Sequence, residues 1–259
     1  MPYAARMRIA SSGPVTFAFA LLVLAACGPK PGAKGPNADG PHECAPGSLP
    51  DCQKQCEVNK NGPSCFQLGS IYQKSPNPAD IAKASFTFDA GCNLGNSPSC
   101  TAAGRMYADG AGVAPDDFRA FAYFQRGCDA KDPEGCVEAG VRLAEGKGAT
   151  EDDVKAKQLF VSACEELSGL GCYWRGVTFE QGIGEEKNDE MSVAYFDRSC
   201  YLGSMKGCAS LGNCYVLGIG VDEDFDKGLA LLDKACKNGN QWACTRLQAA
   251  KNAGGSAPE

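Results

Sequence analysis

Cysteine returns in this chain at a fixed interval. Each member of a second cysteine set lies eight residues after a member of the first set, or nine in the first pair. The first set advances in steps of 36 residues: Cys56, Cys92, Cys128, Cys164, Cys200 and Cys236. Self-similarity with a period of roughly 20 to 50 residues is typical of solenoids, in which each repeat packs on its neighbours. The interval predicts an all-α solenoid of about five to six 36-residue helix-turn-helix repeats.

The N-terminus has the pattern of an export signal. Arg6 and Arg8 precede residues 15–26, a short run that is apolar or small apart from Thr16. A helix that crosses a bilayer needs about 20 apolar residues, and this run is shorter. We therefore expect residues 1–26 to be a cleaved signal peptide.

The sequence LAAC at 24–27 resembles the lipobox of bacterial lipoproteins. The resemblance implies that the Cys27 thiol carries a diacylglycerol and that Cys27 is the first mature residue. Because Gly28 rather than Asp follows, it also implies the outer membrane, facing the periplasm, with surface exposure left open. The alternative is an ordinary cleaved signal with an incidental cysteine.

Composition divides the mature chain into three parts. Residues 27–50 are expected to form a tether, since Gly and Pro are abundant there and such a segment cannot bury a core. The single histidine, His42, falls in this tether. A repeat domain is expected at 51–251 and a disordered tail at 252–259. The net charge of −6 and the absence of a basic cluster argue against nucleic acid and anionic lipid surfaces as partners.

Sixteen cysteines in an exported chain predict a disulfide framework. Zinc sites favour close pairs such as C-x2-C with histidine, and haem attachment needs C-x-x-C-H; neither motif occurs, so no metal or cofactor is expected. Cys214 remains as a free thiol, either a small buried apolar residue or a reactive or intermolecular one. The expected bridges are Cys56–Cys65, Cys92–Cys100, Cys128–Cys136, Cys164–Cys172, Cys200–Cys208 and Cys236–Cys244, with Cys44–Cys52 as a seventh whose pairing is left open.

Each repeat carries the pattern of two helices. In the first, which we call the A helix, a glycine lies four residues after the second cysteine and a large residue seven after it, so the three share one face. In the second, the B helix, a large apolar residue lies four before the next cysteine, between small residues. A helical glycine costs about 1 kcal/mol against alanine, and close approach of a neighbouring helix is expected to offset that cost. One repeat should have helices near 98–109 and 116–128. The large B-helix residues are Phe88, Phe124, Phe160, Phe196 and Leu232.

The segment CTAAGRMYADGAGVAPDDFRAFAYFQRGC resembles a Sel1-like repeat, a relative of the TPR repeat. The resemblance covers about 52–250, and the cysteine pair in each unit is similar to the Helicobacter cysteine-rich proteins. Ala103 and Arg175 replace the usual leucine. The resemblance implies a right-handed superhelix with a concave face lined by A helices. It also implies an adaptor function, because most members of the family hold peptides or proteins. Some cysteine-rich relatives carry a penicillin-binding or β-lactamase label.

An enzyme is the alternative interpretation. A serine β-lactamase uses S-x-x-K, S-D-N and K-T-G, and none of the three occurs in the sequence. Metal-assisted hydrolysis needs histidine and carboxylate ligands, and the sole histidine cannot supply them. The acidic run from Asp222 to Asp226 lacks the glycine of a calcium loop and is better explained as a helix cap. No catalytic residue is predicted.

The binding hypothesis places partner contacts on the A helices. Positions two, five and six after the second cysteine avoid the core offsets and should face a groove or its rim. We expect Trp174, with Arg105 and Arg142, to anchor a periplasmic or envelope protein or peptide. The alternative is that Trp174 fills a gap between repeats. The remaining candidates are Glu138, Gln67, Thr178, Ser210 and Asn213.

Overall fold

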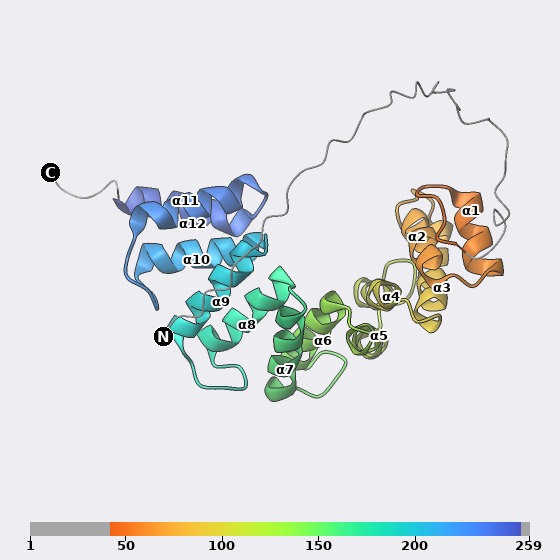
Figure 1. Cartoon of the computed structure of the whole chain (residues 1–259), viewed down its shortest axis with the longest axis horizontal. Helices are drawn as coiled ribbons and strands as arrows, with labels where there is room; N and C mark the ends of the chain where they lie inside the picture. Colours follow the sequence, from red (N-terminus) through yellow and green to blue (C-terminus); the bar gives the residue numbers. More distant parts are fainter. Residues whose placement is uncertain (1–41, 255–259) are drawn as a thin grey trace, which may run out of the picture. The chain divides into compact units, whose positions relative to one another are not determined.

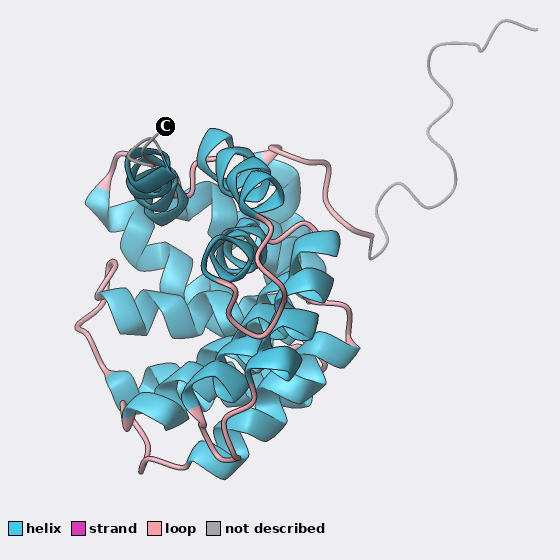
Figure 2. Cartoon of the chain, turned by 90° about the vertical axis from the view of Figure 1, so that its left-hand side faces the viewer, coloured by secondary structure: helices cyan, strands magenta, loops and turns pink. Residues whose placement is uncertain are grey.

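The computed structural model describes residues 42–254 (Figure 1). Every regular element in this range is a helix, joined by loops (Figure 2), so the predicted all-α class is confirmed. Cys27 and residues 1–26, the expected signal peptide, lie outside the described residues. In the described part no helix is long and apolar enough to span a bilayer. The elements are α1 (Leu49–Gln53), the π-helix η1 (Lys54–Val58), α2 (Gly62–Gln73), α3 (Pro78–Asn93), α4 (Ser97–Asp109), α5 (Asp117–Asp129), α6 (Pro133–Glu145), α7 (Asp153–Glu165), α8 (Gly169–Gln181), α9 (Asp189–Tyr201), α10 (Met205–Leu217), α11 (Phe225–Lys237) and α12 (Gln241–Gly254).

The helices pack in the order in which they occur along the chain. From α2 to α12, each helix contacts the next, and each even-numbered helix also contacts the next even-numbered one. The even-numbered helices are the A helices of the sequence pattern and the odd-numbered ones from α3 onward are the B helices. Each A helix is therefore flanked by other A helices as well as by its B partner. This is the solenoid that the period predicts.

Short polar side chains cap the start of most helices, and a glycine ends each of α4, α6, α8 and α10. Asp116 accepts a hydrogen bond from the Arg119 amide at the start of α5, and Asp224 accepts one from the Lys227 amide at the start of α11. Asp224 is thus an N-cap, as the sequence indicates for this acidic run. Gly110 ends α4 in the left-handed region, with φ 68°, which residues with a Cβ seldom adopt.

The helical glycines and the B-helix phenylalanines are partners. A Cβ placed on Gly140 would lie 2.6 Å from Cε1 of Phe160, so the ring of α7 packs directly on the backbone of α6. Gly176 and Phe196 have the same relation between α8 and α9. All four B-helix phenylalanines are almost fully buried. The expected close approach at the glycines is therefore confirmed.

One disulfide closes each repeat, at the turn from a B helix to the following A helix. Cys128 in the last turn of α5 is joined to Cys136 in the first turn of α6, and the brackets that begin at Cys92, Cys164, Cys200 and Cys236 repeat this arrangement. The complete set is Cys44–Cys52, Cys56–Cys65, Cys92–Cys100, Cys128–Cys136, Cys164–Cys172, Cys200–Cys208 and Cys236–Cys244.

The folded part begins earlier and ends later than the sequence suggests. The His42 amide donates to Gln55 Oε1 at 3.2 Å, and the Cys44 amide donates to the buried Ser64 hydroxyl at 3.0 Å. Residues 42–50 are therefore part of the repeat domain and not of the tether. At the other end α12 continues to Gly254, into the segment expected to be a tail. Composition missed the first boundary because the Cys44–Cys52 bridge and the hydrogen bonds from Gln55 and Ser64 come from residues further along the chain.

Candidate functional site

A stripe of polar side chains runs along the open edges of the A helices. Arg105 on α4 donates from Nε to Glu138 on α6 at 3.2 Å. Arg246 on α12 donates from Nε to Asn213 Oδ1 on α10 at 2.9 Å. Both pairs join position five of one A helix to position two of the next. The same register therefore joins α4 to α6 and α10 to α12.

A hollow of about 330 Å³ lies over the C-terminal A helices. Its floor is α10, with Lys206, Ser210 and Asn213, and its walls come from α8 and α12. Trp242 on the α12 wall has 47% of its surface exposed. Large exposed aromatic side chains in a polar surround are the residues that anchor protein interfaces. The hollow is therefore the best-formed candidate for partner contacts on the A-helix face.

Several polar groups in this hollow have no hydrogen-bond partner among the described residues. The Ser210 hydroxyl and the Asn213 Nδ2 amide make no hydrogen bond to any residue between 42 and 254, although Asn213 Oδ1 is engaged by Arg246. The Lys206 ammonium lies 5.8 Å from the centre of the Tyr173 ring on the α8 wall. Burial raises the pKa of the Tyr173 hydroxyl, which therefore stays protonated and can donate a hydrogen bond.

Two of the predicted groove residues face inward instead. Thr178 is fully buried, and its hydroxyl donates to the Arg175 carbonyl at 2.7 Å. The Arg142 side chain is 14% exposed and pairs with Asp117 on α5. The prediction that these two side chains line the groove is wrong. Both lie six residues after the second cysteine of their repeat, a position that packs against neighbouring helices. The stripe of an A helix that stays open to solvent is therefore narrower than the pattern of a single isolated helix predicts.

The remaining predicted residues stay near the A-helix surface, but most contact their own chain. Trp174 stacks on Phe160 with ring centres 5.4 Å apart and packs against three core clusters, so it fills a gap between repeats, the alternative given above. Arg105 is engaged by Glu134 and Glu138. Gln67 donates to Glu43 at 2.6 Å. Only Ser210 and Asn213 of the predicted set line the hollow over α10.

Sequence reasoning missed Lys206 and Trp242, which lie two residues before the second cysteine of their repeats. The spacing contains the signal that would have found them. Lys206 precedes Ser210 by four residues, and Trp242 precedes Arg246 by four, so each pair shares one helix edge. If the candidate positions had included the residue one helical turn before position two, both side chains would have been found.

The inward-facing Arg175 forms a buried ion pair. Its Nη2 donates to Glu185 Oε2 at 3.0 Å, and its Nη1 contacts Glu185 Oε1 and donates to the Thr178 hydroxyl. The guanidinium carbon lies 3.8 Å from the centre of the Phe179 ring. This cluster ties α8 to the loop that leads into α9. It explains how an arginine replaces the usual leucine.

Cys214 is a buried free thiol on α10. Burial, together with Glu180 and Asp189, raises its pKa to about 11. Among the described residues no group of three or more His, Cys, Asp and Glu side chains could hold a metal ion. The groups over α10 are suited to non-covalent recognition.

Comparison with known proteins defines the family. The model of the Sel1 repeat matches 97–132, 133–166, 169–204 and 206–240, more than half of the chain. The chain belongs to the Sel1 repeat family. Its repeats coincide with the helix pairs described above, and Sel1 repeat scaffolds are associated with protein–protein interaction.

Solved structures with a TM-score of 0.67 show the same fold. The c5321 protein of uropathogenic Escherichia coli, described as a protective antigen with an SLR fold, is 26% identical with a TM-score of 0.67; the match covers 81% of this Sel1 repeat protein and 45% of c5321. A Sel1 repeat protein from Oxalobacter formigenes is 24% identical with a TM-score of 0.67, covering 74% and 79% of the two chains. Cysteine rich protein B of Helicobacter pylori is 27% identical with a TM-score of 0.42, covering 51% and 96%. No curated protein matches the chain.

Proposed function

We propose that this protein is a scaffold that binds a protein or peptide partner through the hollow over α10. The observation that carries the proposal is the exposed Trp242 on α12 beside the Ser210 hydroxyl and the Asn213 Nδ2 amide on α10, which have no hydrogen-bond partner among the described residues. An extended segment laid across these helices would meet hydrogen-bonding groups on the floor and an aromatic surface on the wall. Such a combination provides both affinity and register.

The disulfides support this function because they fix the binding surface before the partner arrives. Each bridge joins a B helix to the next A helix, so neighbouring A helices have little freedom to move apart. A surface that is already ordered loses less conformational entropy on binding than a flexible one. A rigid A-helix face is therefore expected to bind without rearrangement.

We further propose that the scaffold is lipid-anchored through Cys27 and faces the periplasm from the outer membrane. The LAAC sequence and Gly28 support the anchor. The seven disulfides support an oxidising compartment, since such bridges persist in the periplasm and are reduced in the cytosol. Incorporation of labelled palmitate into the full chain, and its loss in Cys27→Ser, tests the anchor. Labelling that survives in Cys27→Ser would reject it.

The partner is sought with a photoreactive amino acid at Ser210, which points the crosslink into the hollow. We expect a discrete crosslinked species from envelope extracts and at least about tenfold less of it with Trp242→Ala, as for an interface anchor. Phe118→Ala is the matched control, because Phe118 is an aromatic with 75% exposure on a B helix. Equal crosslinking by both variants contradicts the proposed site. Nitrocefin turnover by the purified domain, absent from a mock preparation, would instead favour a β-lactam hydrolase.

A further inference from the structure

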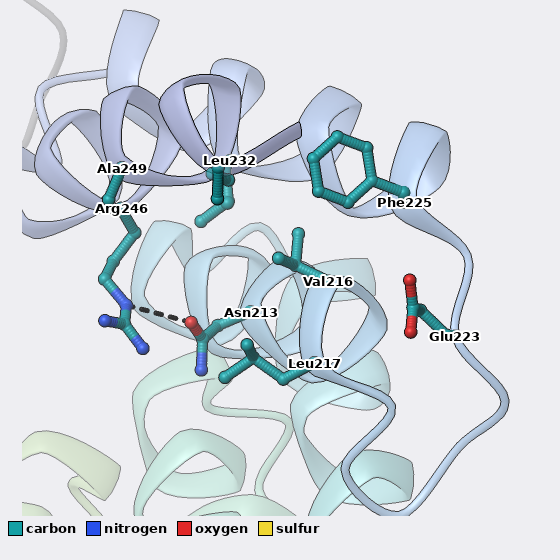
Figure 3. Close-up of a pocket in the computed structure, with 10 residues that line it drawn as sticks. Asn213, Val216, Leu217, Glu223, Phe225, Leu232, Arg246 and Ala249 are labelled. Atoms are coloured by element: carbon teal, nitrogen blue, oxygen red, sulfur yellow. Dashed lines mark hydrogen bonds between the residues drawn. The ribbon is translucent and has the colours of Figure 1, made fainter. Parts of the chain in front are cut away.

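A second cavity, of about 590 Å³, opens between α10, α11 and α12 (Figure 3). Val216 and Leu217 of α10, Leu232 of α11 and Ala250 of α12 form apolar walls. Its volume lies within the range of small-molecule sites, roughly 300 to 1,000 Å³, which are mainly apolar with a few placed polar groups. The cavity is distinct from the hollow over α10, although Asn213 borders both.

Substitutions in this repeat create the cavity. One repeat earlier, the place of Leu232 is taken by Phe196, whose ring fills the space against the glycine of its A helix. Other side chains that line the cavity are also smaller than their equivalents in the preceding repeat. Three α12 alanines stand where the preceding A helix has larger side chains: Ala249, Ala250 and Ala253 in place of Asn213, Cys214 and Leu217. These smaller side chains, on the last A helix of the described chain, distinguish this place from the equivalent one a repeat earlier.

One positive charge lies at the edge of this apolar space. Arg246 Nε is held by Asn213 Oδ1 at 2.9 Å, and its guanidinium carbon lies 5.5 Å from the centre of the Trp242 ring. Its two terminal nitrogens have no hydrogen-bond partner among residues 42–254. Glu223 lies at the opposite end of the cavity (Figure 3). The chain thus fixes the guanidinium in place and leaves its carboxylate-binding donors open.

We propose that this cavity binds an aliphatic carboxylate, with the carboxylate on Arg246 and the hydrocarbon chain along Val216, Leu217 and Leu232. The hydrocarbon replaces water on apolar walls, which is favourable in proportion to the area buried. The charge-assisted hydrogen bonds to the guanidinium select the head group. The negative Glu223 disfavours the reversed orientation. This ligand site shares Asn213 with the hollow over α10 but does not depend on the proposed partner binding.

The test uses residues 28–259, secreted with their disulfides, because the described residues, 42–254, all belong to one compact unit. The chain has two tryptophans, and Trp174→Phe leaves Trp242, close to Arg246, as the reporter. We expect octanoate to change Trp242 emission saturably, and octylamine to give no saturable change. Octan-1-ol, with the same chain and no charge, should bind about tenfold more weakly, as expected for loss of a charged hydrogen bond.

Two variants locate the site. Arg246→Met should weaken octanoate binding by about tenfold or more, while Arg105→Met, which removes a comparable arginine from α4, should leave it unchanged. Leu232→Phe restores the aromatic ring of the other repeats; it should fill the cavity and abolish binding while the thermal unfolding midpoint stays equal or rises. Calorimetric titration of octanoate into Leu232→Phe provides a readout that does not depend on tryptophan.

The outcomes are decisive in both directions. Saturable octanoate binding that is lost in Arg246→Met and in folded Leu232→Phe supports the proposal. Equal affinity for octanoate and octan-1-ol, or unchanged binding in either variant, overturns it. The C-terminus of a polypeptide is the other source of an aliphatic carboxylate, and an acetylated peptide ending in leucine tests for it. If that peptide binds and octanoate does not, the cavity recognises a polypeptide end and the proposal is wrong.

Discussion

Gly104 of α4 lies directly against the aromatic ring of Phe124 of α5. A Cβ on this glycine would be 2.6 Å from Cδ1 and Cε1 of the ring, much closer than ordinary van der Waals contact. Phe124 has no exposed surface. The absence of one methyl group therefore sets the distance between the two helices of the repeat, and the relation returns along the array.

Gly104→Ala should lower the free energy of unfolding by about 1 to 3 kcal/mol, the usual cost of overpacking a core. This outcome opposes helix propensity, which favours alanine over glycine by about 1 kcal/mol. Urea unfolding followed by circular dichroism measures the difference. Combining the substitution with Phe124→Leu should recover part of the loss, because leucine is narrower than the ring. A stabilised single variant would contradict the proposed contact.

Cys128→Ala with Cys136→Ala removes the bridge between α5 and α6. By the loop-entropy relation, a bridge across so short a loop contributes about 2.5 kcal/mol, so the double variant should unfold at lower urea by a corresponding amount. Comparing it with the wild type in the presence and absence of reductant separates this bridge from the remaining six. Unchanged stability would show that packing alone holds this turn.

Glu185→Ala should lower the free energy of unfolding by about 3 kcal/mol, because it leaves the Arg175 guanidinium buried without its partner. The double variant Arg175→Leu with Glu185→Ala should recover most of this loss, since leucine is the residue usual at this position in the repeat. Both are measured by urea unfolding. If the double variant is no better than the single one, the ion pair is not the source of the effect.

Cys214 should react slowly with a thiol reagent in the native protein. Burial raises its pKa to about 11, above the ordinary value, so the neutral thiol is favoured and only about one part in a thousand is thiolate at pH 8. Modification by dithionitrobenzoate in residues 28–259 should speed up as the pH rises and become complete in denaturant, at one thiol per chain. Fast native modification would show that Cys214 is exposed, and Cys214→Ala is the control.

The stripe open to partners was only partly predictable. Ser210 and Asn213 follow from their offsets to Cys208, and the structure places both in the hollow over α10. Thr178 obeys the same offset rule and is buried. The difference arises because an A helix is covered by neighbours on both flanks, and a single-helix pattern contains no information on which neighbour lies closest.

The sequence by itself determined the repeat architecture. A 36-residue period places a glycine in the A helix and a phenylalanine in the B helix of successive repeats, so the same helix-to-helix packing recurs along the chain. The sequence also indicated the disulfides. Cysteines eight residues apart, on either side of the short turn between two helices, come close together without contacts from distant residues. Only the tertiary structure decided where the surface stays open. Trp174 is partly buried against Phe160, whereas Trp242 is exposed, because burial depends on side chains from adjacent repeats, and those vary while the period does not.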